Sequence, residues 1–445
     1  MQVKELIGEM FPCSYETLCI GGLRADEIAE KFGTPLFVYD ESVLQRKWDL
    51  LRSTFPQRFH IHYSVKANPN PHMLRFFLEQ GAGLEVASAG ELYLALGTGC
   101  PPNRILFAGP GKTPAEIEFA LKEEIAEIHA ESLVELDRIA SIASKLNQIA
   151  RVALRVNPGG DAQGGAMRMG GKATPFGIDE EMLDTAVDYA LSRRSLQLRG
   201  IHLFAGTQLL DSEILACQYR KGVEIGRRVA NRIGRPLDSI DFGGGLGVPY
   251  FAGDEPLDME SLRVRLSQLR EEIDGDANFA GTRFVIEPGR FLTAEAGVYL
   301  ARVLDVKVSR AKIFVIVDGG MNHHLAASGN LGQTIKRNFP VAIATKLRHS
   351  EQDTVDIVGP LCTPLDVLAR SLAVPRVELG DLVAVFQSGA YARSASPLGF
   401  LSHPTPPEVL IADGEARLIR RRGTVADYLG DVEDSPQPVA MRGNG

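Results

Sequence analysis

The sequence lacks the features that mark membrane proteins and nucleic-acid-binding proteins. It contains no run of about 18 apolar residues, so we expect no transmembrane helix. The N-terminal segment MQVKELIGEMF carries acidic side chains and no continuous apolar stretch, which makes it a poor signal peptide. The formal net charge of −8 argues against a nucleic-acid partner.

Cysteine is scarce and follows no motif. The chain has 5 cysteines, an odd number, and no C-x-x-C pair; they are Cys13, Cys19, Cys100, Cys217 and Cys362. This usage fits a reducing cytoplasm and argues against a disulfide framework.

Two common nucleotide-binding motifs are also missing. Val248 stands where a G-x-G-x-x-G motif would need its last glycine. Lys172 precedes Ala173, where a P-loop needs Ser or Thr. The sequence therefore indicates neither of these nucleotide sites.

The apolar patterns from residue 36 onward indicate an α/β domain. Short β-rich runs alternate with segments whose apolar residues are spaced three and four apart, as in amphipathic helices. The runs are 36–40, 59–65, 104–109, 150–157, 198–206, 239–245 and 282–289. About eight strand–helix units over roughly 250 residues predict a closed (β/α)8 barrel of the TIM type, and an open doubly wound sheet is the alternative.

The chain changes character beyond this region. Strand-like segments joined by turns follow one another, which predicts a second, mainly β domain. We assign residues 36–292 to the barrel, and residues 1–35 together with 293–425 to a β-sandwich or β-barrel domain. Residues 426–445 are rich in proline, glycine and polar side chains, and we expect a disordered tail.

A lysine stands at the end of one strand-like run. In HIHYSVKANPNPHML, residues 60–74, Lys66 is followed closely by an Asn/Pro turn. The ends of parallel barrel strands face the active site, because the βα loops gather there. A lysine with a partly buried stem at this place can act as an amine nucleophile, and a surface lysine is the alternative.

Two further strand ends carry groups that suit a phosphorylated cofactor. DFGGGLGVPY places Gly243, Gly244 and Gly245 after a strand, where bare backbone amides can surround a phosphate or form a tight turn. VIEPGRFL places Glu287 and Arg290 at another strand end. These two can form a salt-bridged turn, or they can bind a cationic nitrogen and a phosphate separately.

The motifs occur together and in one order. YSVKAN, the glycine loop, EPGR, GPLCTPLD and QSGAYARS resemble the fold-type III pyridoxal-phosphate decarboxylases of diaminopimelate, ornithine and arginine. The resemblance implies an alanine-racemase-like fold, a biosynthetic lyase and pyridoxal 5′-phosphate as the cofactor. The segments HHLAASGNLGQ and GFLSHPTP are most similar to the exosortase-associated branch and to the butirosin-type decarboxylases of carrier-tethered glutamate.

The resemblance assigns roles by position. Lys66 matches the lysine that forms the internal aldimine, and Glu287 matches the acid that keeps the pyridine nitrogen protonated, so that a quinonoid intermediate can form. The positions that match cofactor contacts are Lys66, Glu85, Phe204, Thr207, Gly243, Gly244, Gly245, Glu287, Gly289, Arg290 and Tyr391. No metal is expected, since the only close histidine pairs are His60/His62 and His323/His324.

Other positions match a loop that one subunit offers to the active site of the other. Cys362 matches the thiol that can reprotonate the substrate's α-carbon, and Asp366 lies in the same loop. We assign Thr363, Asp366 and Phe400 to substrate binding. The resemblance therefore implies a homodimer with shared active sites.

Three positions depart from the family pattern. Phe204 stands where a histidine usually stacks on the cofactor ring, so stacking is kept and a proton role is lost; His202, on the same strand face, is the alternative. Thr363 replaces the acid that binds a distal ammonium in diamine-forming relatives. Ala326 stands near the position of an arginine that binds a distal carboxylate.

The missing distal anchors determine the predicted substrate. A buried ammonium without its counter-charge would cost about 2–5 kcal/mol, which disfavours diaminopimelate, ornithine, lysine and arginine. We expect decarboxylation of an L-amino acid whose far end is masked, for example by an acyl carrier protein. The alternatives are a free-amino-acid decarboxylase of the diaminopimelate type, a racemase and a non-catalytic homologue.

Overall fold

The structure is a computed structural model, and it describes residues 3–12, 15–159, 167–168, 173–204, 206–333 and 335–430. The chain divides into two compact units. One comprises residues 44–249 and 254–294, and the other comprises residues 1–43, 250–253 and 295–445. Among the described helices, none is long and apolar enough to cross a membrane.

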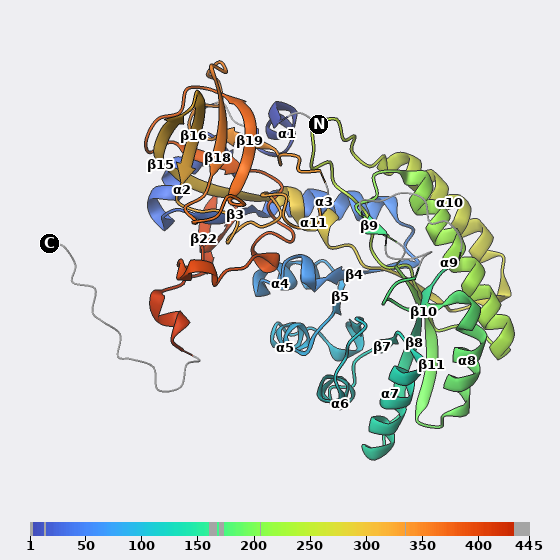
Figure 1. The fold of residues 1–445 in the computed structure, drawn as a ribbon. Helices are drawn as coiled ribbons and strands as arrows, with labels where there is room; N and C mark the ends of the chain where they lie inside the picture. The colour runs from blue at the N-terminus through green and yellow to red at the C-terminus, as the bar shows by residue number, and fades with distance from the viewer. Residues whose placement is uncertain are drawn as a thin grey trace. The chain divides into compact units, whose positions relative to one another are not determined.

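The first unit is built on a closed parallel barrel (Figure 1). Each strand pairs with the next around the ring, and the β7–β8 and β14–β4 pairs complete the closure. The eight strands are β4 (Phe59–Ser64), β5 (Gly83–Val86), β6 (Ile105–Phe107), β7 (Glu127–Ala130), β8 (Ala150–Asn157), β11 (Leu196–Leu203), β13 (Ser239–Asp241) and β14 (Arg283–Ile286). The predicted TIM-type barrel is confirmed, and the open-sheet alternative is excluded. A short strand, β10 (Ile178–Asp179), pairs with β8 outside the ring.

Helices alternate with the barrel strands, and many begin at capping side chains. Asn70 accepts the N–H of His72 and Pro71 occupies the first helical position, so the turn that follows Lys66 also starts the next helix. Ser88 and Ser132 cap two other helices in the same way. The helices are α3 (Glu41–Thr54), α4 (Pro71–Glu79), α5 (Ala89–Gly97), α6 (Pro114–Lys122), α7 (Leu133–Lys145), α8 (Leu183–Ser192), α9 (Ser212–Ile233), α10 (Met259–Asp274) and α11 (Arg290–Thr293).

The second unit is mainly β, as predicted. Its sheet is organised around one long strand, β15 (Gly297–Ser309), which pairs with β16 along one part and with β3 and β20 along another. The remaining strands of this sheet are β3 (Leu36–Asp40), β16 (Lys312–Val317), β17 (Val341–Ile343), β18 (Asp353–Val358), β19 (Val367–Val374), β20 (Leu382–Val385), β21 (Glu408–Ala412) and β22 (Glu415–Arg420). Two helices, α1 (Val3–Met10) and α2 (Ala25–Phe32), and the β1–β2 pair (Cys19–Ile20 and Leu23–Arg24) precede it in the chain.

Strand assignments differ from the expectation at three places. β3 pairs with β15 and β21 in the second sheet instead of entering the barrel; a short, fully buried apolar strand has the same pattern in either sheet. Conversely, the barrel strands β5 and β7 were absent from the expected runs. Buried Glu85, Glu127 and His129 interrupt their apolar patterns.

Two further expectations need correction or limits. Cys19 is disulfide-bonded, contrary to the expectation drawn from cysteine usage, whereas Cys100, Cys217 and Cys362 are free. Of the expected tail, residues 431–445 lie outside the described part of the chain. The described residues just before them include a 3-10 helix, Val425–Tyr428, in which the Tyr428 hydroxyl donates to the Leu398 carbonyl.

An aromatic cluster inside the barrel unit gives a stability prediction. Phe284 is 0% exposed, and its ring centroid lies 5.6 Å from Phe59, 5.9 Å from Phe242 and 5.9 Å from Phe279. We expect Phe284→Ala to lower the free energy of unfolding by about 3–5 kcal/mol, because it removes buried area and leaves a cavity. Urea denaturation measures this. Val264→Ala, at an exposed position of α10, is the control, and equal losses in both variants would contradict the prediction.

Candidate active site

Lys66 lies directly after β4, in a short 3-10 turn, Val65–Ala67. Its Nζ donates to both carboxylate oxygens of Glu85, at 2.9 and 2.7 Å. Glu85 is 1% exposed, whereas the Lys66 side chain is 41% exposed. The lysine therefore has a buried counter-charge and an accessible amine at the carboxyl end of a barrel strand, which is where sequence analysis placed it.

The E-P-G-R turn packs directly on the Lys66 turn. The N–H of Ser64 donates to the carbonyl of Pro288 at 3.2 Å. A Cβ on Gly289 would lie 2.8 Å from the Cβ of Ala67 and 3.0 Å from that of Ser64, so only glycine fits there without a shift. Arg290 follows as the first residue of α11. Closure of the barrel between β14 and β4 thus brings residues far apart in sequence into one site.

The glycine loop after β13 has a backbone that side chains would disturb. Gly243 and Gly245 have φ of +68° and +107°, in the left-handed region that favours glycine. A Cβ on Gly244 would lie 2.5 Å from the carbonyl oxygen of Glu287. The N–H of Gly243 already donates to Oδ1 of Asp241 at 2.8 Å, which leaves Gly244 and Gly245 as the better placed candidates for phosphate binding.

Glu287 follows β14 and is buried beside three other polar side chains. Its Oε2 lies 3.4 Å from Nε2 of His202, and its Oε1 has no hydrogen-bond partner among the described residues. The His202 ring lies 4.4 Å from the ring of His129, centroid to centroid. Asp241 completes the group, with Oδ2 4.0 Å from Nε2 of His129. The sequence suggested His202 only for stacking on the cofactor. His129 and Asp241 were not predicted, because no motif links residues so far apart in the chain.

Phe204 and an arginine that sequence analysis missed lie beside the glycine loop. A Cβ on Gly243 would lie 2.8 Å from the Phe204 ring. The guanidinium of Arg155 is 5.9 Å from the Phe204 ring centroid, and its Nη1 donates to Oε1 of Glu131 at 2.7 Å. The aromatic face predicted for position 204 is therefore next to the predicted phosphate loop. The sequence did not single out Arg155, because a polar residue within the strand ARVALRVN is equally compatible with an exposed position.

Thr207 also lies in the barrel unit. It belongs to a short strand, β12 (Gly206–Thr207), which pairs with β9 (Met167–Arg168). Lys172 and much of the segment before it lie outside the described residues. Thr207 remains a predicted phosphate ligand.

The other predicted residues belong to the β unit. Asp366 is 2% exposed and accepts the backbone N–H groups of Met321 at 2.7 Å and Leu361 at 2.9 Å, so it supports the turn that carries Cys362. Cys362 is exposed, and the Thr363 hydroxyl accepts the N–H of Leu365 at 3.3 Å. Of the remaining members, Ala326 is half-buried, Tyr391 has a left-handed backbone with φ of 52°, and Phe400 is exposed. Their roles stay predictions.

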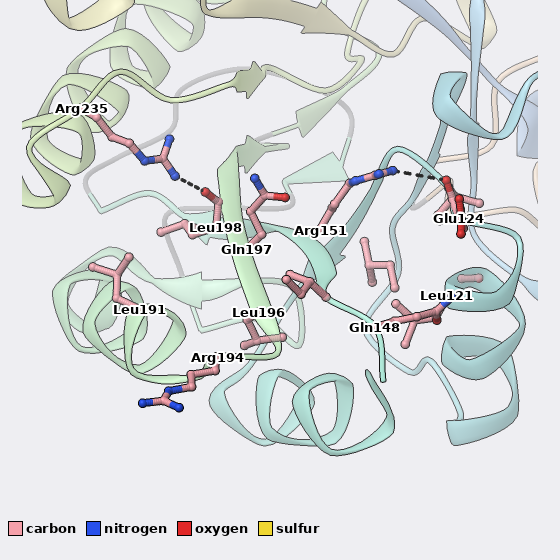
Figure 2. Close-up of a pocket in the computed structure, with 14 residues that line it drawn as sticks. Leu121, Glu124, Gln148, Arg151, Leu191, Arg194, Leu196, Gln197, Leu198 and Arg235 are labelled. Carbon is pink, nitrogen blue, oxygen red and sulfur yellow. Dashed lines mark hydrogen bonds between the residues drawn. The ribbon is translucent and has the colours of Figure 1, made fainter. Parts of the chain in front are cut away.

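A separate cavity of about 690 Å³ lies at the other end of the barrel strands (Figure 2). It is lined by residues at the amino-terminal ends of β8 and β11, such as Arg151 and Leu196. Arg235 Nη2 donates to the Leu198 carbonyl there at 2.7 Å. None of the predicted cofactor residues lines this cavity, so we do not assign it to catalysis.

Comparison with known proteins defines the class. Residues 41–294 match the family described as pyridoxal-dependent decarboxylase, pyridoxal binding domain. The chain belongs to this family. It is therefore a decarboxylase that uses pyridoxal phosphate, as sequence analysis predicted.

Individual relatives cover nearly the whole chain. L-glutamyl-[BtrI acyl-carrier protein] decarboxylase of Niallia circulans is 41% identical, over 90% of this chain and 94% of that protein. Diaminopimelate decarboxylase of Aquifex aeolicus is 34% identical, over 93% and 94%. A crystal structure of diaminopimelate decarboxylase from M. jannaschi matches with a TM-score of 0.89 at 28% identity, covering 98% of this chain and all of that one.

The described residues fit pyridoxal phosphate in three respects. Lys66 offers an accessible amine, and buried Glu287 has an oxygen without a hydrogen-bond partner among the described side chains. The glycine loop leaves space that side chains would fill. When bound, the cofactor supplies an electron sink for the negative charge that decarboxylation leaves on the substrate.

A nearby carboxyl group gives a pH prediction. Glu91, in the first turn of α5, accepts the N–H of Ala87 at 2.8 Å. Burial raises the pKa of Glu91 from 4.5 to about 7, partly offset by that hydrogen bond. A raised folded pKa means that stability present below pH 4.5 is lost as the pH rises through about 7.

Glutamine does not titrate. We therefore expect the unfolding temperature of Glu91→Gln to rise relative to that of the unsubstituted protein as the pH increases from 4.5 to about 7. Differential scanning calorimetry across the interval measures the difference. Glu118→Gln, at an exposed position paired with Lys122, should show no such gain. Parallel pH curves for Glu91→Gln and the unsubstituted protein would contradict the prediction.

Proposed function

We propose that this decarboxylase acts on an L-amino acid whose far end is masked, as in a glutamyl group tethered to an acyl carrier protein. The observation that carries the proposal is Thr363, the neutral residue directly after Cys362, at the position of an acid in diamine-forming relatives. Its hydroxyl is engaged in a local turn with Leu365. The relative from Niallia circulans, whose name gives a carrier-bound glutamyl substrate, supports this choice.

The proposed roles follow the geometry of the barrel unit. Lys66 binds the cofactor and is paired with Glu85 until then. Glu287 would pair with the protonated pyridine nitrogen, and Phe204 would offer an aromatic face to the ring. In the barrel unit, the glycine loop, Thr207 and Arg290 would be the candidates to bind the phosphate, because their chemistry suits an anion. Tyr391, in the β unit, is a further candidate.

The remaining roles concern the substrate. Cys362 returns a proton to the α-carbon after CO2 has left, while Asp366 and Phe400 border the substrate. We propose a homodimer in which one subunit completes the active site of the other, with an acyl carrier protein as a transient partner. A cytoplasmic location is also part of the proposal.

Replacement of Lys66 tests the catalytic assignment. We expect Lys66→Ala to lose the yellow absorbance of bound cofactor and to lose CO2 release by on the order of 10³-fold or more, because the covalent attachment is gone. Lys122→Ala, at an exposed position of α6, should retain both. Unchanged absorbance and turnover in Lys66→Ala would refute the assignment.

A substrate comparison tests the masked far end. We expect kcat/KM for CO2 release to be at least about 100-fold higher with a glutamyl carrier protein than with free glutamate, diaminopimelate or ornithine, a difference of about 2.7 kcal/mol. Thr363→Glu should shift the preference toward ornithine, because it restores a charge for the distal ammonium. Thr363→Val, which adds no charge, is the matched control. Equal efficiency with free diaminopimelate would show that the substrate proposal is wrong while leaving the decarboxylase class intact.

A further inference from the structure

Four buried polar side chains meet inside the barrel at Glu287. His129 lies in β7, His202 in β11, Asp241 at the end of β13 and Glu287 just after β14. One nitrogen or oxygen atom of each lies within 4.8 Å of the others. His202 and Asp241 are also register partners on neighbouring strands. Buried polar groups are costly unless their hydrogen-bonding groups find partners, so the protonation states of these four side chains are constrained.

The environment favours neutral partners around a single charge. Burial lowers the pKa of His129 and His202 well below the ordinary value, so both imidazoles are uncharged. Burial and the neighbouring Glu287 raise the pKa of Asp241 well above its ordinary value. A second carboxyl group this close in a buried site disfavours the ionised form of Asp241.

Asp241 is also hydrogen-bonded to the glycine loop, and this loop contacts the turn at Glu287 through its backbone. Its Oδ1 accepts the N–H of Gly243 at 2.8 Å, in the glycine loop. The backbone N–H of Glu287 donates to the carbonyl of the same Gly243, again at 2.8 Å. Oδ2 of Asp241 and Oε1 of Glu287 have no hydrogen-bond partner among the described residues. A proton on Asp241 would provide a donor for Glu287.

We propose that Asp241 is a protonated positioning residue that donates a hydrogen bond to Glu287. With His129 and His202 neutral, Glu287 is then the one negatively charged member of the group, available to the pyridine nitrogen of the cofactor. This inference rests on the proposed role of Glu287. It assigns Asp241 a function through Glu287 and not in direct contact with the substrate. The two carboxyl groups share one proton, and no further reactant is needed.

Two substitutions of Asp241 separate this role from a simple packing role. Asparagine has the shape of a protonated aspartic acid, with an oxygen that can accept from Gly243 and an N–H that can donate to Glu287. We expect the cofactor dissociation constant of Asp241→Asn to stay within about twofold of the unsubstituted value. In Asp241→Ala it should rise roughly 10- to 100-fold, because Glu287 loses its donor. The position of the cofactor's visible absorbance band should follow the same order.

Infrared spectroscopy tests the protonation directly. At neutral pH, the difference spectrum between the unsubstituted holoenzyme and Asp241→Asn should show the loss of one carboxylic-acid C=O band and no loss of a carboxylate band. This readout does not depend on turnover or on the identity of the substrate. It therefore distinguishes failure of this inference from failure of the proposed function, which the Lys66 variant tests.

A matched control comes from the opposite end of the barrel. Glu127 is equally buried and accepts from Ser239 at 2.8 Å and Arg283 at 3.1 Å. Glu127→Gln should lower the unfolding temperature without changing cofactor affinity or absorbance.

Several outcomes would overturn the inference. Loss of a carboxylate band in Asp241→Asn would show that Asp241 is ionised. A large loss of cofactor affinity in this variant would also show that Asp241 acts as a carboxylate and not as a protonated acid. Unchanged affinity in a folded Asp241→Ala would remove the positioning role. If the purified protein contained stoichiometric zinc and Asp241→Asn did not, the four side chains would form a metal site and the shared proton would be ruled out.

Discussion

Pairing between β14 and β4 closes the barrel, and the candidate active site depends on this closure. Register partners such as Ile286 and Ile61 bring the strand end before Glu287 beside the strand end before Lys66. The hydrogen bond from Ser64 to Pro288 then continues the contact into the two turns. Because Gly289 has no side chain, the turns approach closely enough to share one surface. Lys66, the proposed amine, and Glu287, the proposed partner of the pyridine nitrogen, therefore follow two strands that are paired with each other.

The charged side chains Lys66 and Glu287 have different electrostatic environments. Lys66 is half exposed and has a full counter-charge in buried Glu85, so an accessible cation is stabilised without being enclosed. Glu287 lies deeper, beside two imidazoles whose pKa values burial lowers and a carboxyl group whose pKa burial raises. In a low-dielectric interior, neutral neighbours do not compensate a negative charge on Glu287, so a cationic partner there is favoured. The contrast suits the roles proposed for the two residues, a reactive amine at Lys66 and an acid that holds a proton on the cofactor at Glu287.

The β unit contributes a different kind of constraint. Asp366 uses both carboxylate oxygens to hold backbone N–H groups, and Gly320 and Gly359 give it room. This side chain therefore determines the shape of the turn that presents Cys362 and Thr363. Thr363→Glu would add a charge to that turn while the two backbone N–H groups remain bonded to Asp366. Substrate preference in such an arrangement can change at one position while the supporting hydrogen bonds persist.

The sequence by itself determined the class of fold, the cofactor and the principal strand-end residues. Strand ends in a parallel barrel meet at one face, so Lys66, the glycine loop and Glu287 could be placed together from local patterns and motif order. Periodicity could not assign Leu36–Asp40 to its sheet, because a buried strand has the same apolar pattern in either one. It also missed β5 and β7, where Glu85 and Glu127 interrupt the apolar run.

Only the tertiary structure decided what surrounds the acid. His129, His202 and Asp241 are separated along the chain by tens of residues, and no motif in the sequence links the three to one another. Their meeting with Glu287 follows from the order of strands around the closed ring. Protonation is decided at the same level, since the pKa of a carboxyl group depends on burial and on the charges beside it. Local sequence specifies which groups are present, and the closed barrel specifies which of them can carry a charge.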